Sequence, residues 1–371
     1  METKFALPFF GGCACGAIRY ECTAPPLRMV FWETTLQCNL SCRHCRRLRQ
    51  SNPHELTTDE GRRLIDQIRE ISITQDGPGT VLVFSGGEPL IREDMFALAD
   101  HARAARLPTA LASNAATIDE RTARRIAEAG IARVAISLDA PTAELHDRIR
   151  GQRGSFDRAL RAMGYLRQSA VPVQINMTIT RDTKTLFTQM VDLAQRCQAV
   201  ALHVFLFVPV GCGAELGPDQ MLDAEEAEVF LTHLHEVARA ASVRIKPTCA
   251  PQYYRMLAQQ GELTGGDTWH RFTRGCLGGI NVCFVSNSGL VFPCGYLPVS
   301  AGDVRKTTLQ EIWSTSPLFK QLRNQTSIQA ACGSCEYLDC CGGCRARAYS
   351  LTGNFLGEDP TCTYGARRNS R

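Results

Sequence analysis

No apolar run in the 371-residue sequence approaches the ~20 residues that a membrane-spanning helix needs, so we expect no membrane segment. The first ten residues contain no basic segment followed by a long apolar one, so we expect no secretory signal. The net charge of +4 is small for this length, so charge gives no reason to expect nucleic acid as a partner. These absences predict a cytoplasmic protein that binds neither a membrane nor nucleic acid.

Internal repeats and low-complexity tracts are also absent from the sequence. Cysteine, in contrast, is abundant, with 18 residues, and a small secreted domain would use so many in disulfides. This chain is large and lacks an export signal, and in a reducing compartment clustered cysteines more often bind metal. Twelve of the 18 cysteines fall into two groups, at 38–45 and 276–362. The cysteine pattern therefore predicts metal sites rather than disulfides.

The first two thirds of the chain alternate two patterns. Short apolar or β-branched runs predict buried parallel strands at Met29–Thr34, Val81–Phe84, Pro108–Ala112, Val134–Leu138, Val173–Thr178 and Leu202–Val208. Helical periodicity between them predicts a helix starting near Thr57, where Glu60 completes a capping box, and helices at Arg92–Arg106, Asp119–Ala129, Ser155–Gln168, Thr185–Cys197 and Asp223–Ala240. Six strand–helix units predict an α/β fold whose parallel sheet curves into a full or partial barrel. Ligands of such sheets bind at the carboxyl ends of the strands.

The pattern changes near residue 245, and residues 270–365 are rich in cysteine, glycine and turn signals. A segment with so little apolar core of its own depends on metal for its shape. We therefore expect three parts, which are an N-terminal extension at 1–28, a core domain at 29–245 and a cysteine-rich domain at 246–371.

The first cysteine group directly follows the first predicted strand, as Cys38-x3-Cys42-x2-Cys45. Three thiolates can ligate three irons of one 4Fe-4S cluster and leave the fourth iron open to an external ligand. The alternative is a zinc site completed by His44, although His44 is confined between two ligands of the same tight loop.

Polar residues and glycines follow the later strands. Ser85-Gly86-Gly87-Glu88-Pro89 comes after the second strand, where glycines let the backbone approach a ligand and Glu88 can accept from an ammonium group. Asn114 ends the third strand, Ser137 and Asp139 end the fourth, and Arg150 follows. Each alone could be a helix cap or a surface turn, but their succession at strand ends favours a common site.

This loop and these strand ends resemble the radical S-adenosylmethionine (SAM) superfamily. The resemblance implies a partial (β/α)6 barrel in which SAM binds the open iron held by Cys38, Cys42 and Cys45. His44 would lie beside the adenine, and the motif from Ser85 through Gly86 and Gly87 to Glu88 would hold the methionine amino group. Asn114, Ser137 and Asp139 would serve the ribose and methionyl moieties, and Arg150 the SAM carboxylate. The expected chemistry is reductive cleavage of SAM to a 5′-deoxyadenosyl radical that takes a hydrogen atom from the substrate.

The second cysteine group consists of Cys276, Cys283 and Cys294, then Cys332, Cys335, Cys341 and Cys344, and finally Cys362. Eight thiolates suffice for two 4Fe-4S clusters, or for two structural zinc sites. The group resembles the SPASM domain, which carries two auxiliary clusters. That resemblance implies one cluster on Cys276, Cys283, Cys294 and Cys344, and another on Cys332, Cys335, Cys341 and Cys362. Cys340 could take the place of Cys341.

Several stretches are similar to the AhbD-type heme synthase of the siroheme-derived heme pathway. They are 174–181, 203–211, 248–255, 273–279, 293–296 and 341–349. That family converts iron-coproporphyrin III to heme b by decarboxylating two propionates to vinyl groups. The resemblance implies a porphyrin substrate, an electron donor such as flavodoxin or ferredoxin, and auxiliary clusters that take up an electron. The rivals are a SPASM-type maturase that crosslinks a ribosomal peptide and a non-catalytic iron–sulfur electron carrier.

A porphyrin with four carboxylates needs cationic anchors and flat apolar walls. Candidate anchors are Arg255, Arg274, Arg345 and Arg347, and candidate wall residues are Tyr253, Tyr254 and Phe207. Cys249 and His203 are candidate axial or radical-quenching groups. For each of these residues, a plain structural role is the competing interpretation and the commoner one.

The N-terminal residues 11–21 look like the opening of the glutathione-dependent formaldehyde-activating zinc fold. The further zinc ligands of that fold are absent. We therefore expect Cys13, Cys15 and Cys22 to lie in a hairpin without a catalytic role.

Overall fold

The computed structural model describes residues 24–47, 54–75, 79–263 and 275–364. The predictions for Cys13, Cys15, Cys22 and Arg274 lie outside these residues.

The described strands form one ten-stranded sheet with the order β10-β9-β8-β1-β2-β3-β4-β5-β6-β7. Strands β1 to β8 pair in parallel, and β9 and β10 pair antiparallel at one edge. Their bounds are β1 Met29–Glu33, β2 Val81–Ser85, β3 Thr109–Ser113, β4 Val134–Ser137, β5 Val173–Ile179, β6 Ala201–Leu206, β7 Arg244–Thr248, β8 Val282–Val285, β9 Leu290–Phe292 and β10 Gly302–Asp303. The predicted α/β partial barrel is confirmed, and β7 is a parallel strand that the sequence did not predict.

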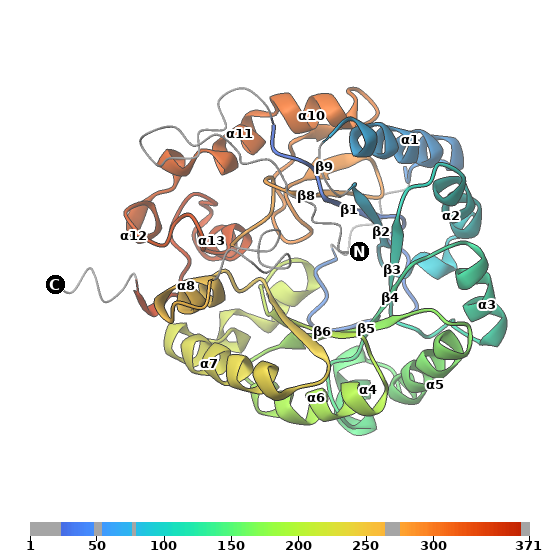
Figure 1. Ribbon diagram of the computed structural model, residues 1–371, viewed down its shortest axis with the longest axis horizontal. Coiled ribbons are helices and arrows are strands. Elements are labelled where there is room, and N and C mark those ends of the chain that lie inside the picture. Colours follow the sequence, from blue (N-terminus) through green and yellow to red (C-terminus); the bar gives the residue numbers. More distant parts are fainter. Residues whose placement is uncertain (1–23, 48–53, 76–78, 264–274, 365–371) are drawn as a thin grey trace, which may run out of the picture.

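Helices form a ring outside the curved sheet (Figure 1). Those of the first part are α1 Thr58–Thr74, α2 Met95–Ala104, α3 Glu120–Glu128, α4 Ala143–Arg150, α5 Ser155–Gln168, α6 Phe187–Arg196 and α7 Ala224–Ala240. Those that follow β7 are α8 Gln252–Gln259, α10 Leu309–Thr315, α11 Pro317–Arg323, α12 Ala330–Gly333 and α13 Arg345–Thr352. The capping box of Thr57 and Glu60 is confirmed at the start of α1, whereas α4 was not predicted.

The main core lies between the sheet and the helix ring. On β1, Val30 and Trp32 point outward and are fully buried. The Trp32 ring takes the space beside Gly61 of α1, where an added Cβ would lie 2.6 Å from Trp32 Cη2. Removing a buried aromatic side chain of this size costs about 3–5 kcal/mol. This packing fixes the strand that leads into the first cysteine loop.

The inner face of the sheet is more polar. On β5 and β6, the apolar residues Ile175 and Leu202 are fully buried, while their neighbours Asn176 and His203 are only partly buried. Because side chains alternate along a strand, Asn176 and His203 face the barrel interior. The fold therefore provides a polar interior next to the strand ends.

The cysteine-rich part extends the same sheet, because β8 pairs with β1 in parallel. It is also tied to the first part by side chains. Trp313 Nε1 donates to Pro25 O at 2.8 Å, and Arg305 forms an ion pair with Glu60 at 2.7 Å. In Figure 1, α10 to α13 complete the ring between α8 and α1.

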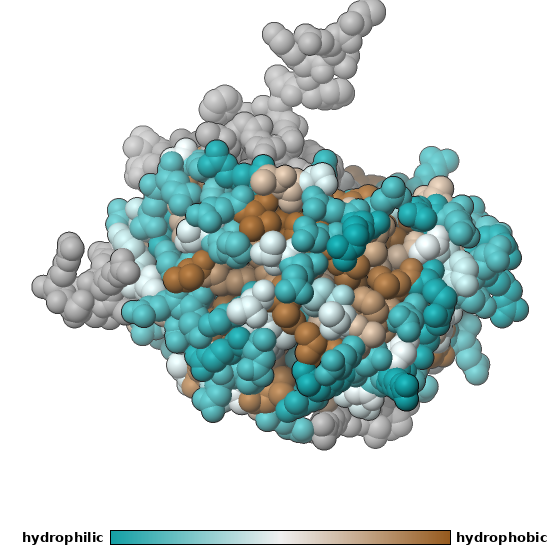
Figure 2. Space-filling view, turned by 90° about the horizontal axis from the view of Figure 1, so that it is seen from below, coloured by the Kyte–Doolittle hydropathy of each residue, from teal (hydrophilic) through white to brown (hydrophobic). Residues whose placement is uncertain are grey.

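Figure 2 shows one side of the molecule as mainly hydrophilic, with small hydrophobic groups between polar residues. None of the described helices is long and apolar enough to cross a membrane.

Candidate active site

The loop after β1 carries Cys38, Cys42 and Cys45, all of which are free and partly buried thiols. Neighbouring strand ends hold its backbone. Gly87 N donates to Thr35 O and Glu88 N to Gln37 O, both at 2.8 Å, and Gly213 N donates to Cys45 O at 2.9 Å. Burial raises the pKa of Cys38 and of Cys45, so a bound metal is needed to keep these thiols ionised at neutral pH.

Two glycines make this close packing possible. A Cβ added at Gly87 would lie 2.1 Å from Gln37 O, and one added at Gly211 would lie 2.1 Å from Arg46 O. Gly211 also has a φ of +60°, in the left-handed region. The motif after β2 therefore supports the cysteine loop from one side, and the segment after β6 supports it from the other.

Glu88 is fully buried at the end of β2. Its carboxylate accepts from Ser113 Oγ at 2.9 Å and from Asn114 N at 2.7 Å. Burial raises the pKa of Glu88 to about 7, and these hydrogen bonds only partly offset the effect. Within the described part of the chain, no basic side chain pairs with this carboxylate. A buried carboxylate without a cation is the group that a ligand ammonium would stabilise.

Asp139 and Arg150 form a buried ion pair, with Oδ2 and Nη2 2.6 Å apart. Arg150 Nη1 lies 3.6 Å from Cys42 Sγ, and His44 Nε2 lies 3.4 Å from Asp139 Oδ2. Burial raises the pKa of Asp139, but the positive charge of Arg150 outweighs this and leaves it below its usual value. Burial lowers the pKa of His44, so its ring is neutral at pH 7.

Arg150 Nε is buried and has no hydrogen-bond partner, which leaves one donor of this group for a ligand. His44 is engaged by Asp139, so its contacts do not favour the zinc alternative. In addition, no group of three or more described His, Cys, Asp or Glu side chains is placed to hold a single metal ion. A cubane cluster spreads its ligands over separate irons and suits such a wider arrangement.

The remaining predicted residues lie around the same loop. Asn114 Nδ2 donates to Asn39 Oδ1 at 2.7 Å and lies 3.6 Å from Cys38 Sγ. Ser137 ends β4 and pairs in register with Asn176. Ser85 Oγ accepts from Arg46 Nη2 at 3.3 Å. The structure thus brings the predicted strand-end residues to the rim of the cysteine loop.

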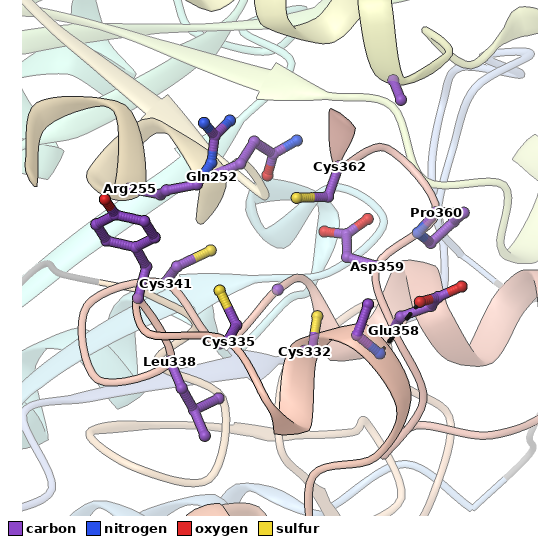
Figure 3. A pocket seen from close by; sticks show the side chains of 15 residues that line it. Gln252, Arg255, Cys332, Cys335, Leu338, Cys341, Glu358, Asp359, Pro360 and Cys362 are labelled. Atoms are coloured by element: carbon purple, nitrogen blue, oxygen red, sulfur yellow. Dashed lines mark hydrogen bonds between the residues drawn. The ribbon is translucent and has the colours of Figure 1, made fainter. Parts of the chain in front are cut away.

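A separate cavity of about 140 Å³ lies in the cysteine-rich part (Figure 3). The sulfur atoms of Cys332, Cys335, Cys341 and Cys362 point into it, and we call this group the second auxiliary site. Four thiolates around one zinc at about 2.3 Å would leave no such space. Arg255 Nε and Gln252 Oε1 are buried there without hydrogen-bond partners, as expected where a larger group belongs.

Cys340 does not line this cavity. Its Sγ faces the carbonyl oxygens of Tyr337, at 3.4 Å, and of Tyr254, at 3.9 Å. The geometry therefore favours Cys341 over Cys340 as the member of the second auxiliary site.

The other predicted auxiliary group is only partly assembled. Cys276, Cys294 and Cys344 are close enough to interact electrostatically, and we call these three the first auxiliary site. Cys283 is not among them. It is fully buried on β8, and the one charged neighbour that affects its thiol is Arg323.

Three of the arginines predicted to anchor a porphyrin have protein partners instead. Arg255 pairs with Glu228, and Arg347 pairs with Asp359 at 2.8 Å. Arg345 Nη1 donates to the carbonyl of Gly357 at 2.6 Å. Of the predicted wall residues, Tyr253 is buried with its hydroxyl 3.0 Å from His235 Nδ1, so it contributes to the core.

Lys246 is a candidate that the sequence did not reveal, because β7 was not predicted. It pairs in register with His203, so both residues face the barrel interior. Burial lowers the pKa of Lys246 to about 8 and that of His203 to about 3, and the positive charge of Lys246 further lowers the latter. Lys246 forms no ion pair within the described residues. The only sign of this site in the sequence is that Lys246 stands in a short run of alternating polar and apolar residues.

Comparisons with known proteins fit this geometry. The model of the radical SAM superfamily matches residues 32–194, and that of an iron-sulfur cluster-binding domain, SPASM, matches residues 276–341. The chain is 40% identical to the AdoMet-dependent heme synthase of Oleidesulfovibrio alaskensis over 93% of this chain and 89% of that protein. It is also 40% identical to the AdoMet-dependent heme synthase of Methanosarcina barkeri, over 91% and 96%.

A more distant relative is the mycofactocin maturase MftC of Mycobacterium tuberculosis, with 32% identity over 91% of this chain and 83% of that protein. Among solved structures, Streptococcus suis SuiB bound to S-adenosylmethionine superposes with a TM-score of 0.71. The match covers 92% of this chain and 78% of SuiB at 18% identity, and at this identity it shows the fold alone.

Proposed function

The chain belongs to the AdoMet-dependent heme synthases of the radical SAM superfamily, and from this membership we propose that it converts iron-coproporphyrin III to heme b. It is a radical SAM enzyme whose cofactors are SAM and 4Fe-4S clusters. The observation that supports this substrate is the 40% identity to two heme synthases, which extends over about nine tenths of this chain and of each relative. In the proposed reaction, each of two propionates loses one β-hydrogen atom, carbon dioxide and one electron, and becomes a vinyl group.

Cys38, Cys42 and Cys45 are the proposed ligands of the SAM-binding cluster. When bound, this cluster and SAM supply the hydrogen-abstracting radical, and the auxiliary clusters offer sites that can accept an electron. Glu88 would receive the SAM ammonium, which neutralises a buried carboxylate that no cation of the described residues pairs with. Arg150 would bind the SAM carboxylate through its free Nε–H while Asp139 holds the guanidinium in place.

The other strand-end residues complete the proposed SAM site. The neutral His44 ring would lie against the adenine, while Gly86 and Gly87 let the backbone approach the methionyl group. Ser85, Asn114 and Ser137 supply hydroxyl and amide groups for the remaining polar atoms. Together with the helix ring, these residues would keep water from the reacting groups.

The second auxiliary site would hold a cluster on Cys332, Cys335, Cys341 and Cys362. The orphaned Arg255 Nε–H lines that cavity and can donate to a cluster sulfur. Such donors tune the reduction potential of an iron–sulfur cluster.

Lys246 is the proposed anchor for a substrate carboxylate. The porphyrin carries four propionates, and a partly buried amine that pairs with no carboxylate in the described part of the chain is suited to bind one of them. Binding an anion would also raise the pKa of Lys246 back from about 8, which stabilises the complex at neutral pH. The adjacent neutral His203 can donate or accept a further hydrogen bond.

The electron donor is proposed to be a small protein such as flavodoxin or ferredoxin. The proposed compartment is the cytoplasm, because none of the 15 described cysteines is in a disulfide and a reducing environment keeps thiols reduced. The division into parts at 1–28, 29–245 and 246–371 also stays a proposal.

Anaerobic turnover tests the proposed function. Reduced protein, SAM and iron-coproporphyrin III should give a porphyrin that has lost two carboxyl groups by mass, together with 5′-deoxyadenosine. A Cys45→Ala variant should give neither product. Cleavage of SAM with the porphyrin left intact would contradict the proposal and would favour a peptide substrate instead.

A further inference from the structure

We propose that Cys249 is the fourth thiolate ligand of the first auxiliary site, together with Cys276, Cys294 and Cys344, and that Cys283 is a structural residue. This assignment concerns how the chain binds a cluster, so it does not depend on the porphyrin substrate.

Cys249 is held at the junction between β7 and α8. Its carbonyl accepts from Arg347 Nη1 at 2.9 Å, and Arg347 is itself fixed by two hydrogen bonds of 2.8 Å to Asp359. The backbone of Cys249 has a φ of +55°, which is unusual for a residue with a side chain. Such a conformation is strained and tends to be kept where function requires it.

The Cys249 side chain lies among the cysteines of the first auxiliary site. Its side chain packs with that of Cys294 against Cys344, and its thiol is close enough to those of Cys344 and Cys294 to interact electrostatically. Cys276 in turn interacts with Cys344 and Cys294. The four thiols therefore form one connected group, although they come from four separate segments of the chain.

The surrounding side chains form one small apolar cluster. Val208, Leu297, Cys344 and Ala346 form its buried centre, and Cys249, Cys294 and Tyr296 pack against them. Cys249, Cys276 and Cys294 each stay partly exposed, and Cys344 is buried. Four thiolates fully ligate a 4Fe-4S cluster, whereas three would leave one iron open.

Cys283 lies on the outer face of the sheet, away from the barrel interior. The next residue, Phe284, faces the barrel interior, where the Arg46 guanidinium lies 4.6 Å from its ring centroid. Because side chains alternate along β8, Cys283 points outward. It packs in the main core, and its charged neighbour Arg323 stacks on Trp313 at 4.2 Å. A buried cysteine in such surroundings behaves as a small apolar side chain.

The Arg347–Asp359 pair connects the two auxiliary sites. Asp359 lines the cavity of the second auxiliary site, and its Oδ2 accepts from Cys344 N at 2.7 Å. Arg347 reaches the Cys249 carbonyl from the same pair. Hydrogen bonds of this kind orient metal ligands, and here they fix the positions of Cys249 and Cys344 relative to each other.

Matched alanine variants test the assignment. In a background with Cys38, Cys42 and Cys45 changed to Ala, the anaerobically reconstituted protein should hold about eight irons on its two auxiliary clusters. Adding Cys249→Ala should lower the iron content below eight per chain and change or remove one of the two EPR signals after reduction, because three thiolates leave one iron of that cluster without a protein ligand. Adding Cys283→Ala should leave both the iron content and the EPR spectrum unchanged.

Two results would overturn the assignment. The first is a Cys249→Ala variant that keeps all its iron and an unchanged EPR spectrum. The second is a Cys283→Ala variant that loses about four irons while its circular dichroism spectrum stays native. If Cys249→Ala does not fold, Cys249→Ser decides, because an oxygen ligand should shift the g values of one cluster and a structural residue should not.

Discussion

At the scale of single residues, the candidate SAM site contains a buried carboxylate and a buried guanidinium, each of which lacks an interaction partner. Glu88 lacks a cation among the described residues, and Arg150 keeps one N–H without a partner although it is paired with Asp139. In a protein without a bound ligand, a buried charge that lacks partners lowers the free energy of unfolding. Both groups gain partners if they bind the ammonium and carboxylate of the SAM methionyl moiety.

A Glu88→Gln substitution should therefore weaken SAM binding more than it changes the fold. The lost interaction with an ammonium is worth about 1.5–3 kcal/mol, which corresponds to roughly a 10- to 150-fold rise in Kd. Anaerobic equilibrium binding of SAM to the reconstituted protein measures this change. Glu128→Gln, at an exposed position of α3, is the matched control and should leave Kd unchanged.

The raised pKa of Glu88 also predicts how SAM binding depends on pH. In the protein without SAM, Glu88 binds a proton as pH falls below about 7, and the neutral acid no longer attracts an ammonium. SAM affinity should therefore fall as pH decreases from 8 to 6, and this slope should be absent in Glu88→Gln. Equal slopes in the two proteins would assign the pH dependence to another group.

Lys246 makes a separate prediction about the substrate. Lys246→Met keeps the length of the side chain but removes its charge, so it should raise KM for the porphyrin about tenfold or more and leave SAM binding intact. Steady-state kinetics with both substrates measures this. Lys306→Met removes an exposed lysine, whose side chain is 82% accessible, and should change neither parameter.

At the scale of elements, the cysteine loop depends on two turns that pack on it. Gly87→Ala would place a Cβ 2.1 Å from Gln37 O, so the loop would have to move. We expect this variant to lose the SAM-binding cluster, with about four fewer irons per chain, while the auxiliary clusters remain. Iron analysis and SAM cleavage measure the change.

The matched control for this prediction is Gly164→Ala in α5, where an added Cβ meets nothing within 4 Å. It should keep its full iron content and gain about 0.5–1 kcal/mol in the free energy of unfolding, because alanine favours a helix more than glycine does. Equal iron contents for the two glycine variants would show that the turn after β2 is not needed to hold the loop.

Elements with clear local patterns could be predicted from the sequence. The six apolar strands and the capped helix α1 were found because hydrophobic runs and a capping box are local signals. Strand β7 was missed because Arg244 and Lys246 make it polar and because Pro247, which has no N–H to donate, is disfavoured within strands. Helix α4 follows a strand end and spans only Ala143–Arg150, which is about two helical turns. A helix of this length is too short to show a clear periodicity in the sequence.

The candidate SAM site was also predictable, because the carboxyl ends of parallel strands meet at one edge. The first auxiliary site was not. Spacing alone could not tell which face of β8 Cys283 occupies, since that depends on its register with Val30 of β1. Nor could it bring Cys249 to Cys344, because 94 residues separate them and the contact exists only in the folded chain.

At the scale of the whole molecule, one continuous sheet joins the two halves of the chain. Strand β8 extends the sheet at β1, the strand that leads into the cysteine loop. Arg46, next to Cys45, packs against Phe284 of β8 and against Gly295 beside Cys294. The SAM site and the first auxiliary site are thus connected through a single layer of packed side chains, which suits a reaction that releases an electron after hydrogen abstraction.

The central claim is that the radical formed at the Cys38–Cys45 loop acts on a porphyrin propionate. The most direct measurement uses iron-coproporphyrin III deuterated at the β-carbons of its propionates, incubated anaerobically with reduced protein and SAM. We predict 5′-deoxyadenosine that carries one deuterium, in step with the appearance of vinyl groups on the porphyrin. Undeuterated 5′-deoxyadenosine beside an intact porphyrin would contradict this account.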